Sequence, residues 1–191
     1  MDKKNVNKSE EKQLLEEIKK DSSKFGIIFD EYYPDIFGYI FRRVGDFDSA
    51  RDISSETFLK AFLNINTFKW RDVAISSWLY RIAGNEIMQY HRKRKYKPQS
   101  LDSIVDATNW DTPDPESTNE EKARLEKEMT NQQDFIEIQQ KIKKLPQVHQ
   151  EALTLRYFEQ KSILEVATIL QKSEGTIKSL LSRGIEKLKK A

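Results

Sequence analysis

An acidic segment near the middle of the chain divides it into two stretches, each with the pattern of packed helices. Between residues 98 and 130, nine acids stand against three bases, a net charge of −6, and Pro113 and Pro115 interrupt any regular element. Such a segment cannot bury enough apolar surface to form a core. We therefore predict two small domains joined by an acidic flexible linker. The predicted bounds are 1–23 for an N-terminal lead-in, 24–97 for the first domain, 98–131 for the linker and 132–191 for the second domain.

The composition favours helices and excludes several kinds of site. The chain of 191 residues has only six glycines and five prolines, fewer than short strands with frequent turns would use, so the predicted fold class is all-α. It has no cysteine and only two histidines, His91 and His149, which excludes disulfides and a cysteine or histidine zinc site. No metal and no cofactor is expected.

The hydropathy pattern contains no membrane or export signal. No run of about 18 apolar residues is present, as a membrane-spanning helix would need. The N-terminus has no apolar signal-peptide core. We expect a cytoplasmic protein with no membrane insertion.

The first domain opens with an aromatic-rich stretch from Lys24 to Val44. Core packing explains these rings better than base stacking, although stacking stays an alternative. Pro34 disfavours helical geometry at the residue before it, so two helices with a break or kink there are predicted. The next helix is predicted over 48–65, capped by Asp48, with Phe62 in its buried stripe.

The outer face of the 48–65 helix is polar and places Asp52 and Glu56 one turn apart. The simplest interpretation is a face exposed to solvent. A sharper one is a docking face for a partner helix. A third is an enzyme, for instance a nuclease, that holds a divalent metal with the two carboxylates, but no further ligand converges on them in the sequence.

A helix that begins apolar and ends cationic follows a polar, aromatic connection. Ser76 or Ser77 is predicted to cap this helix, which begins at Trp78, and its later part presents Asn85 and Gln89 outward. Cations then crowd its end, at Arg92, Lys93, Arg94, Lys95 and Lys97. A polyanion lying across this end suits such a charge distribution. The connection before it, with Lys69, Trp70 and Arg71, suits single-stranded nucleic acid or a loop folded onto its own core.

The end of the second domain has the pattern of a helix-turn-helix. Ser162 and Glu165 form a predicted capping box, and Gln171-Lys172-Ser173 makes a short turn without the usual glycine. Ser173 is predicted to cap the second helix. Residues predicted to face a major groove there are Ser173, Glu174, Thr176, Lys178, Ser179 and Arg183.

Four strings, in this order and spacing, resemble the bacterial RNA polymerase sigma factors, in particular the extracytoplasmic-function (ECF) group. They are YYPDIFGYIFRRVGD, DSARDISSETFLKAF, SSWLYRIAGNEIMQYHRKRK and LPQVHQEALTLRYFEQKSILEVATILQKSEGTIKSLLSRGIEKLK. The resemblance covers roughly residues 24–97 and 132–190. It implies a transcription initiation factor without catalysis of its own, which binds core RNA polymerase and directs it to promoters.

The resemblance also implies roles for particular residues. Residues 24–97 look like region 2, which melts the promoter, and residues 132–190 look like region 4, whose recognition helix would read the −35 element. The clamp helices of the polymerase largest subunit would be bound by Asp52, Ser55, Glu56, Thr57 and Lys60. The −10 element would be held by Lys69, Trp70, Arg71, Asn85, Gln89, Arg92 and Lys93. The −35 element would be read by Ser173, Glu174, Thr176, Lys178, Ser179 and Arg183.

Further partners follow from the resemblance alone. The helices before the recognition helix would touch the polymerase flap, and an anti-sigma factor is a possible partner. Gly84 departs from the family pattern and costs a helix interior about 1 kcal/mol relative to alanine. The alternative function is a helix-turn-helix regulator that binds duplex promoter DNA without polymerase. The polar face around Asp52 and Glu56 argues against it.

Overall fold

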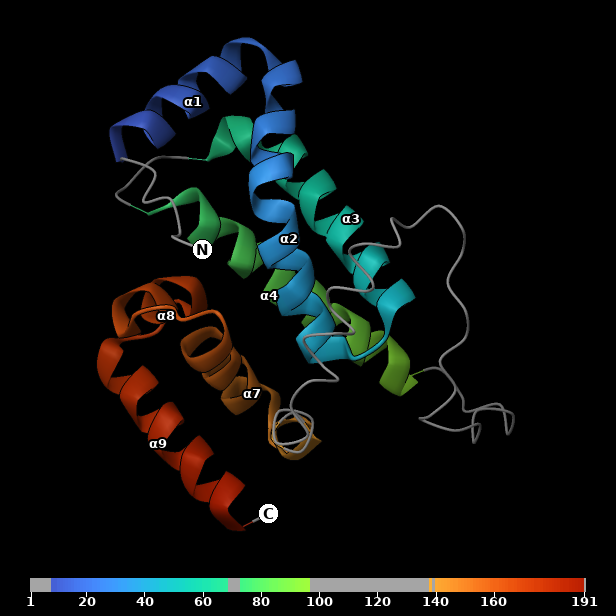
Figure 1. The fold of residues 1–191 in the computed structure, drawn as a ribbon, viewed down its shortest axis with the longest axis vertical. Coiled ribbons are helices and arrows are strands. Elements are labelled where there is room, and N and C mark those ends of the chain that lie inside the picture. The colour runs from blue at the N-terminus through green and yellow to red at the C-terminus, as the bar shows by residue number, and fades with distance from the viewer. Residues whose placement is uncertain (1–7, 69–72, 97–137, 139, 191) are drawn as a thin grey trace.

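The computed structural model describes residues 8–68, 73–96, 138 and 140–190, and every regular element in these ranges is a helix (Figure 1). The predicted all-α class is confirmed. The N-terminal half comprises α1 (Lys8–Lys20), the 3₁₀ turn η1 (Ser22–Lys24), α2 (Phe25–Val44), α3 (Phe47–Asn64), the 3₁₀ turn η2 (Ile65–Thr67) and α4 (Ile75–Tyr96). The C-terminal half comprises α7 (Gln147–Leu153), the π-helical turn η4 (Thr154–Phe158), α8 (Ile163–Leu170) and α9 (Glu174–Lys190). The predicted linker lies outside the described residues.

Aromatic side chains of α2 and α3 build the core of the N-terminal half. Phe37, at 1% exposure, stacks on Phe41 with ring centroids 6.2 Å apart and meets Phe47 edge-on at 5.3 Å. Phe29 meets Phe58 edge-on at 4.9 Å. These rings are engaged with one another, so core packing, and not base stacking, explains the aromatic stretch.

The predicted division into two helices at Pro34 is wrong, because α2 runs without interruption through it. Proline removes one hydrogen bond within the helix, at a cost of about 3 kcal/mol. Pro34 and Asp30, whose carbonyl loses that bond, are both exposed, so water can bond the carbonyl. Ile28 and Ile36 are fully buried on either side, and burying each contributes about 1.5–3 kcal/mol. Tertiary packing therefore outweighs the local preference.

The starts of α3 and α4 differ from the predicted ones. Asp46, and not Asp48, caps α3, since its carboxylate accepts a hydrogen bond of 2.8 Å from the Ser49 amide. Gly45 precedes it with φ +76°, the left-handed conformation that ends α2. In α4 the first residue is the fully buried Ile75, so Ser76 and Ser77 lie inside the helix and do not cap it.

One residue of the predicted buried stripe of α3 lies at the surface. Phe62 is 40% exposed and does not belong to the buried stripe.

The C-terminal half contains the predicted helix-turn-helix. Both hydrogen bonds of the Ser162–Glu165 capping box are present at the start of α8. Gln171 takes the left-handed conformation, with φ 53°, at the turn position where glycine is usual. Ser173 then caps α9 by accepting a hydrogen bond of 3.2 Å from the Thr176 amide.

The two halves pack against each other. Helix α4 contacts α8, and α2 contacts η4, as the neighbouring ribbons in Figure 1 show. Gly84 of α4 lies at this junction: a Cβ atom there would be 2.5 Å from Oε1 of Glu151 in α7. A glycine in the interior of α4 thus lets Glu151 approach the helix backbone closely.

Candidate polymerase and nucleic-acid interfaces

One side of α3 presents a polar face flanked by apolar side chains. Asp52, Ser55 and Glu56 are exposed there, as predicted for the polymerase-binding set. Leu59 and Leu63 continue the exposed surface along the helix, with 51% and 66% of their areas accessible. The two leucines lie one helical turn apart and so share one side of α3. Neither leucine belongs to the predicted polymerase-binding set.

Thr57 does not belong to this face. Its side chain is fully buried, and its hydroxyl donates a 2.7 Å hydrogen bond to the carbonyl of Ile53. A threonine whose hydroxyl is satisfied within its own helix has no group left for a partner protein. The structure therefore places Thr57 in the core of the N-terminal half, away from any docking surface.

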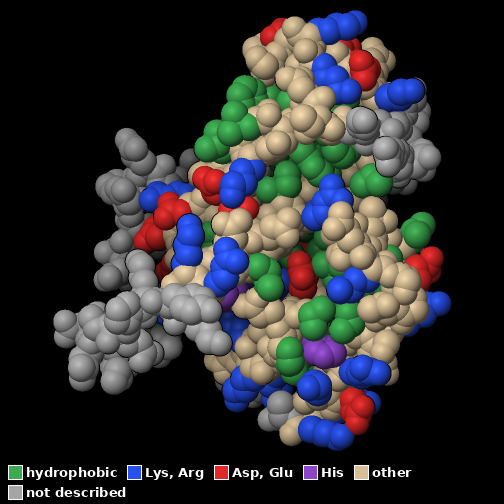
Figure 2. Space-filling view, turned by 180° about the vertical axis from the view of Figure 1, so that it is seen from behind, with side chains coloured by type: hydrophobic (Ala, Val, Ile, Leu, Met, Phe, Trp, Pro, Cys, Tyr) green, Lys and Arg blue, Asp and Glu red, His purple; other side chains and the backbone are tan. Residues whose placement is uncertain are grey.

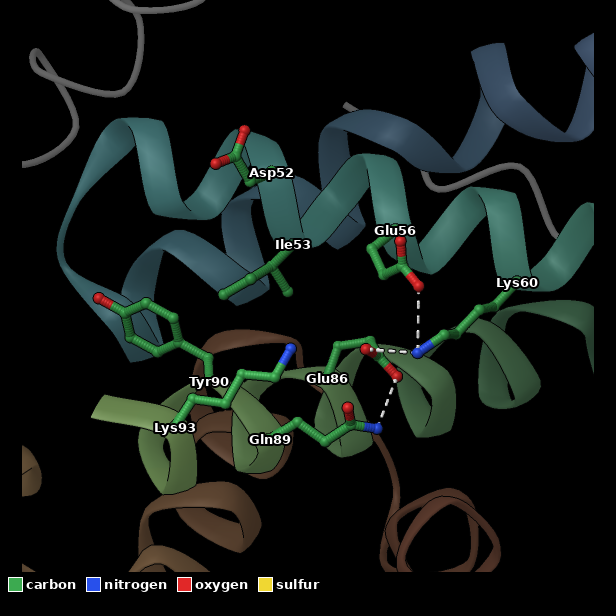
Figure 3. Close-up of a pocket in the computed structure, with 8 residues that line it drawn as sticks. All are labelled: Asp52, Ile53, Glu56, Lys60, Glu86, Gln89, Tyr90 and Lys93. Atoms are coloured by element: carbon green, nitrogen blue, oxygen red, sulfur yellow. Dashed lines mark hydrogen bonds and ion pairs between the residues drawn. The ribbon is translucent and has the colours of Figure 1, made fainter. Parts of the chain in front are cut away.

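A groove of about 360 Å³ runs between α3 and α4 (Figure 3). Its lining comes from both helices and comprises Asp52, Ile53, Glu56, Lys60, Glu86, Gln89, Tyr90 and Lys93. Members of the predicted polymerase-binding set and of the predicted −10 set thus line the same groove. A partner bound along α3 and a strand bound along α4 would lie side by side.

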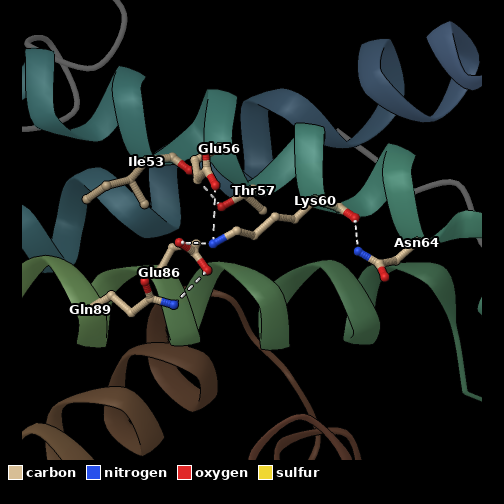
Figure 4. A network of polar contacts seen from close by, with 7 residues as sticks. All are labelled: Ile53, Glu56, Thr57, Lys60, Asn64, Glu86 and Gln89. Carbon is tan, nitrogen blue, oxygen red and sulfur yellow. Dashed lines mark hydrogen bonds and ion pairs between the residues drawn. The ribbon is translucent and has the colours of Figure 1, made fainter.

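An ion-pair network spans this groove (Figure 4). Lys60 of α3 lies 2.7 Å from a carboxylate oxygen of Glu86 and 3.2 Å from one of Glu56. The hydrogen bond to Glu86 is the main reason that the pKa of Lys60 is raised. Gln89 directs its amide toward the other oxygen of Glu86 at 3.4 Å. Lys60 and Gln89 are therefore oriented by contacts within the chain.

Sequence reasoning missed Glu86, which is 8% exposed. A signal was present, because Glu86 falls at the helical spacing of the buried residues Leu79 and Ala83. A carboxylate at a core position requires a partner of opposite charge. The partner, Lys60, is on another helix, 26 positions away in the sequence, so the pairing depends on how α3 and α4 pack.

The outer side of α4 presents part of the predicted −10 set. Asn85, Arg92 and Lys93 are exposed, and Gln89 is half-buried. The other members of that set, Lys69, Trp70 and Arg71, lie outside the described residues. Just before them, Phe68 is buried against Trp78, with ring centroids 4.6 Å apart, so its ring belongs to the core.

The predicted recognition helix, α9, leaves its polar side free. Its predicted −35 residues Ser173, Glu174, Thr176, Lys178 and Arg183 are exposed, and Ser179 is half-buried. Ile177 and Leu181 are buried on the opposite side of the helix. Five bases against two acids make α9 positive, which suits a phosphate backbone. On the face in Figure 2, Lys and Arg side chains predominate at the lower end, over the C-terminal half.

Near the start of α9, two hydroxyls are already engaged with each other. The Ser173 and Thr176 side-chain oxygens are 2.9 Å apart. His149 of α7 lies under the middle of α9, with Nδ1 3.0 Å from the carbonyl of Leu180. This contact is structural, as expected for a lone histidine in a helical domain.

Metal sites and membrane spans are both absent from the described ranges. No group of three or more histidine, aspartate or glutamate side chains in the described ranges is placed to hold a metal ion. No helix in the described part of the chain is long and apolar enough to cross a membrane.

Comparison with known proteins identifies the class that this fold and these faces define. The family model of sigma-70 region 2 matches residues 28–96, and that of sigma-70 region 4 matches residues 135–188. Together the two matches cover well over half of the chain. The chain belongs to the sigma-70 family of RNA polymerase sigma factors, in the ECF group, and is a transcription initiation factor that directs polymerase to promoters.

Particular relatives share nearly the whole length. The chain is 35% identical over 185 residues to the ECF RNA polymerase sigma factor SigW of Bacillus subtilis, covering 94% of this chain and 95% of that protein. It is 31% identical to the RNA polymerase sigma-H factor of Pseudomonas aeruginosa, covering 97% and 95%. Among solved structures, the sigma factor RpoE of Bartonella quintana, in complex with the anti-sigma factor NepR, has a similar fold. Its TM-score is 0.64 at 22% identity, with 87% of this chain and 94% of that chain covered.

Proposed function

We propose that three exposed surfaces of this sigma factor divide the work of promoter recognition, and that none of them is catalytic. The N-terminal half, residues 24–97, acts as region 2, and the C-terminal half, residues 132–191, acts as region 4. The polar face of α3, with Asp52, Ser55 and Glu56, binds the polymerase clamp helices, and Lys60 lies at its edge. Thr57 is left out of this set because it is buried.

The −10 element is assigned to the outer side of α4 and the connection before it. Asn85 and Gln89 carry amides that can hydrogen-bond base edges, while Arg92 and Lys93 contact phosphates and position the strand. Lys69, Trp70 and Arg71 complete this set as a prediction from the sequence. The groove between α3 and α4 supports the proposal, because members of both predicted sets line it.

The −35 element is assigned to the exposed side of α9. A helix that follows a helix-turn-helix turn and exposes polar residues near its start fits a major groove. Ser173, Glu174, Thr176 and Lys178 are exposed at that end, and Arg183 is exposed farther along the helix. The helices that precede α9 are proposed to touch the polymerase flap.

Runoff transcription with core polymerase and purified protein tests the two DNA assignments. Arg183→Ala should weaken use of the −35 element, and Asn85→Ala use of the −10 element, each by roughly 5- to 150-fold, as loss of one base contact implies. Lys12→Ala and Gln13→Ala, which change exposed residues of α1, are matched controls and should have no effect.

Two results would count against these assignments. The effect of Asn85→Ala should not depend on the −35 element, and the effect of Arg183→Ala should not depend on the −10 element. If mutations in the −35 element abolished the effect of Asn85→Ala, the two domains would have been assigned the wrong way round. The same holds if mutations in the −10 element abolished the effect of Arg183→Ala. Tight binding to duplex promoter DNA without polymerase would instead favour the alternative, a polymerase-independent regulator.

The setting of this activity is inferred from the family. A factor that binds core polymerase works in the cytoplasm. RpoE of Bartonella quintana was solved with an anti-sigma factor bound, and we extend a partner of that class to this chain. Copurification of tagged protein with core polymerase, and with a second protein that blocks runoff transcription, tests this point.

A further inference from the structure

A buried polar cluster joins the two halves of the molecule at one carboxylate. Glu159, directly after η4, is 3% exposed. Its Oε1 accepts hydrogen bonds from Nε and Nη2 of Arg42 in α2, at 3.0 and 2.6 Å, and its Oε2 accepts one of 2.9 Å from the Tyr80 hydroxyl in α4. One side chain of the C-terminal half is thus bonded by two helices of the N-terminal half.

The backbone around η4 positions the Glu159 carboxylate at this contact. Helix α7 widens into the π-helical turn η4, and the Glu159 amide donates to the carbonyl of Thr154, five residues back, at 3.1 Å. Gln160 follows with φ 52°. A π-helical turn in a helix frequently marks a functional position. Lys161, just beyond, lies over the Tyr80 ring at 4.8 Å from its centroid.

Charged and hydroxyl groups make this contact easier to separate than an apolar one. Burying an ion pair removes water from both charges, and this cost cancels much of their attraction. When the halves part, Arg42, Tyr80 and Glu159 can all be hydrated again. The rest of the contact between the halves includes apolar side chains, because the buried core is continuous across them. Removing one partner of the buried ion pair leaves the other charge unpaired, which disfavours the closed arrangement.

The closed arrangement is too small to read both promoter elements. A compact chain of 191 residues has a radius of gyration of roughly 16 Å, so it is about 40 Å across. Elements centred about 25 base pairs apart lie about 85 Å apart along DNA, at about 3.4 Å per base pair. The chain between residues 96 and 138 can cover that distance, since an extended chain spans about 3.4 Å per residue.

We propose that Arg42, Tyr80 and Glu159 form an interdomain latch that holds the free sigma factor closed and opposes its binding to core polymerase. The need for opening rests on the proposed function, namely α4 at the −10 element and α9 at the −35 element. The latch itself concerns the free protein. Polymerase binds the open form, so breaking the latch raises the apparent affinity for polymerase.

A distance measurement in the free protein tests the latch. The chain has no cysteine, so Asp48→Cys and Lys187→Cys, at exposed positions in α3 and α9, can carry two nitroxide labels for pulsed electron spin resonance. The otherwise unchanged protein should give one short, narrow distance distribution. Glu159→Gln should move most molecules to longer and broader distances. Glu186→Gln, which alters an exposed carboxylate of α9 that pairs with Lys190 of the same helix, is the matched control.

A charge exchange separates opening from local unfolding. Arg42→Glu and Glu159→Arg should each open the molecule, and the two together should restore the short distance, with far-UV circular dichroism unchanged. The latch is refuted if the Glu159→Gln distribution matches that of the unchanged protein. It is also refuted if the exchange fails to restore the short distance.

Binding to core polymerase tests the consequence of the latch. Glu159→Gln should bind core polymerase at least threefold more tightly than the unchanged protein, and Glu186→Gln equally well. An open Glu159→Gln protein with unchanged polymerase affinity would refute the claim that the latch opposes binding. Neither readout uses a promoter, so an error in the −10 or −35 assignment leaves both results interpretable.

Discussion

Replacing Gly84 by alanine sets two effects of similar size against each other. In a helix interior, alanine is more stable than glycine by about 1 kcal/mol. The added Cβ, however, would lie 2.5 Å from Oε1 of Glu151 and 3.6 Å from the Tyr39 hydroxyl. The carboxylate must move by roughly 1 Å to reach an ordinary contact distance, since carbon atoms and their neighbours approach to about 3.5 Å.

The sizes of the two effects predict the outcome. The Glu151 oxygen is at the end of its side chain and can move, at a cost of about 0.5–1.5 kcal/mol for an unfavourable rotamer. Gly84→Ala alone should therefore change the free energy of unfolding by no more than about 0.5 kcal/mol. In a Glu151→Ala background the clash is gone, and the same substitution should stabilise by about 1 kcal/mol.

Urea denaturation followed by far-UV circular dichroism measures this difference. With a slope of about 2 kcal/mol per molar urea, a gain of 1 kcal/mol raises the midpoint by about 0.5 M. The comparison needs four proteins: the unchanged chain, the two single variants and the double variant. Equal stabilisation of about 1 kcal/mol in both backgrounds would refute the contact between Gly84 and Glu151.

Three further predictions concern side chains with defined partners. Thr57→Val should leave the affinity for core polymerase unchanged in a pull-down titration, whereas Glu56→Lys should lower this affinity at least tenfold. A loss of affinity in Thr57→Val would show that Thr57 contributes to the docking face. Ser162→Ala should cost about 0.5–2 kcal/mol of stability through loss of the capping box, seen as a lower urea midpoint, with the exposed Ser182→Ala as its control. Burial raises the pKa of Glu151 above 4.5, the ordinary value for glutamate. The neutral form of Glu151 therefore contributes its full stability below pH 4.5. That contribution is lost as the pH rises through the raised pKa. Glu151→Gln should therefore become more stable than the unchanged protein as urea titrations move from pH 4 to pH 8; a difference that is constant with pH would contradict this.

The helix-turn-helix shows how much a local pattern can predict. The capping box at Ser162 and Glu165 and the cap at Ser173 are formed by residues three positions apart, so the sequence contains all the groups involved. Even the turn without glycine was located correctly, although only the structure shows that Gln171 takes the left-handed conformation there.

The α3 face shows where such reasoning stops. Helical spacing placed Asp52 and Glu56 on the exposed side, whereas the family resemblance implied the same face for Thr57, which is buried. Phe62 was expected inside and is 40% exposed. A residue at the edge of an amphipathic stripe becomes buried or exposed according to which neighbour covers it, and that neighbour comes from elsewhere in the chain.

By itself, the sequence determined the all-α class, the positions of most helices and the family, because these follow from periodicity, caps and motif order. Only the tertiary structure determined that α2 continues through Pro34 and that Lys60 pairs with Glu86. It also explains Gly84, because Glu151 approaches the backbone of α4 at this position. The tertiary structure also brought Arg42, Tyr80 and Glu159 together from three separate parts of the chain. Hydrogen bonds between residues 79 and 117 positions apart leave no periodic trace in a sequence, because they depend on how the helices pack against one another.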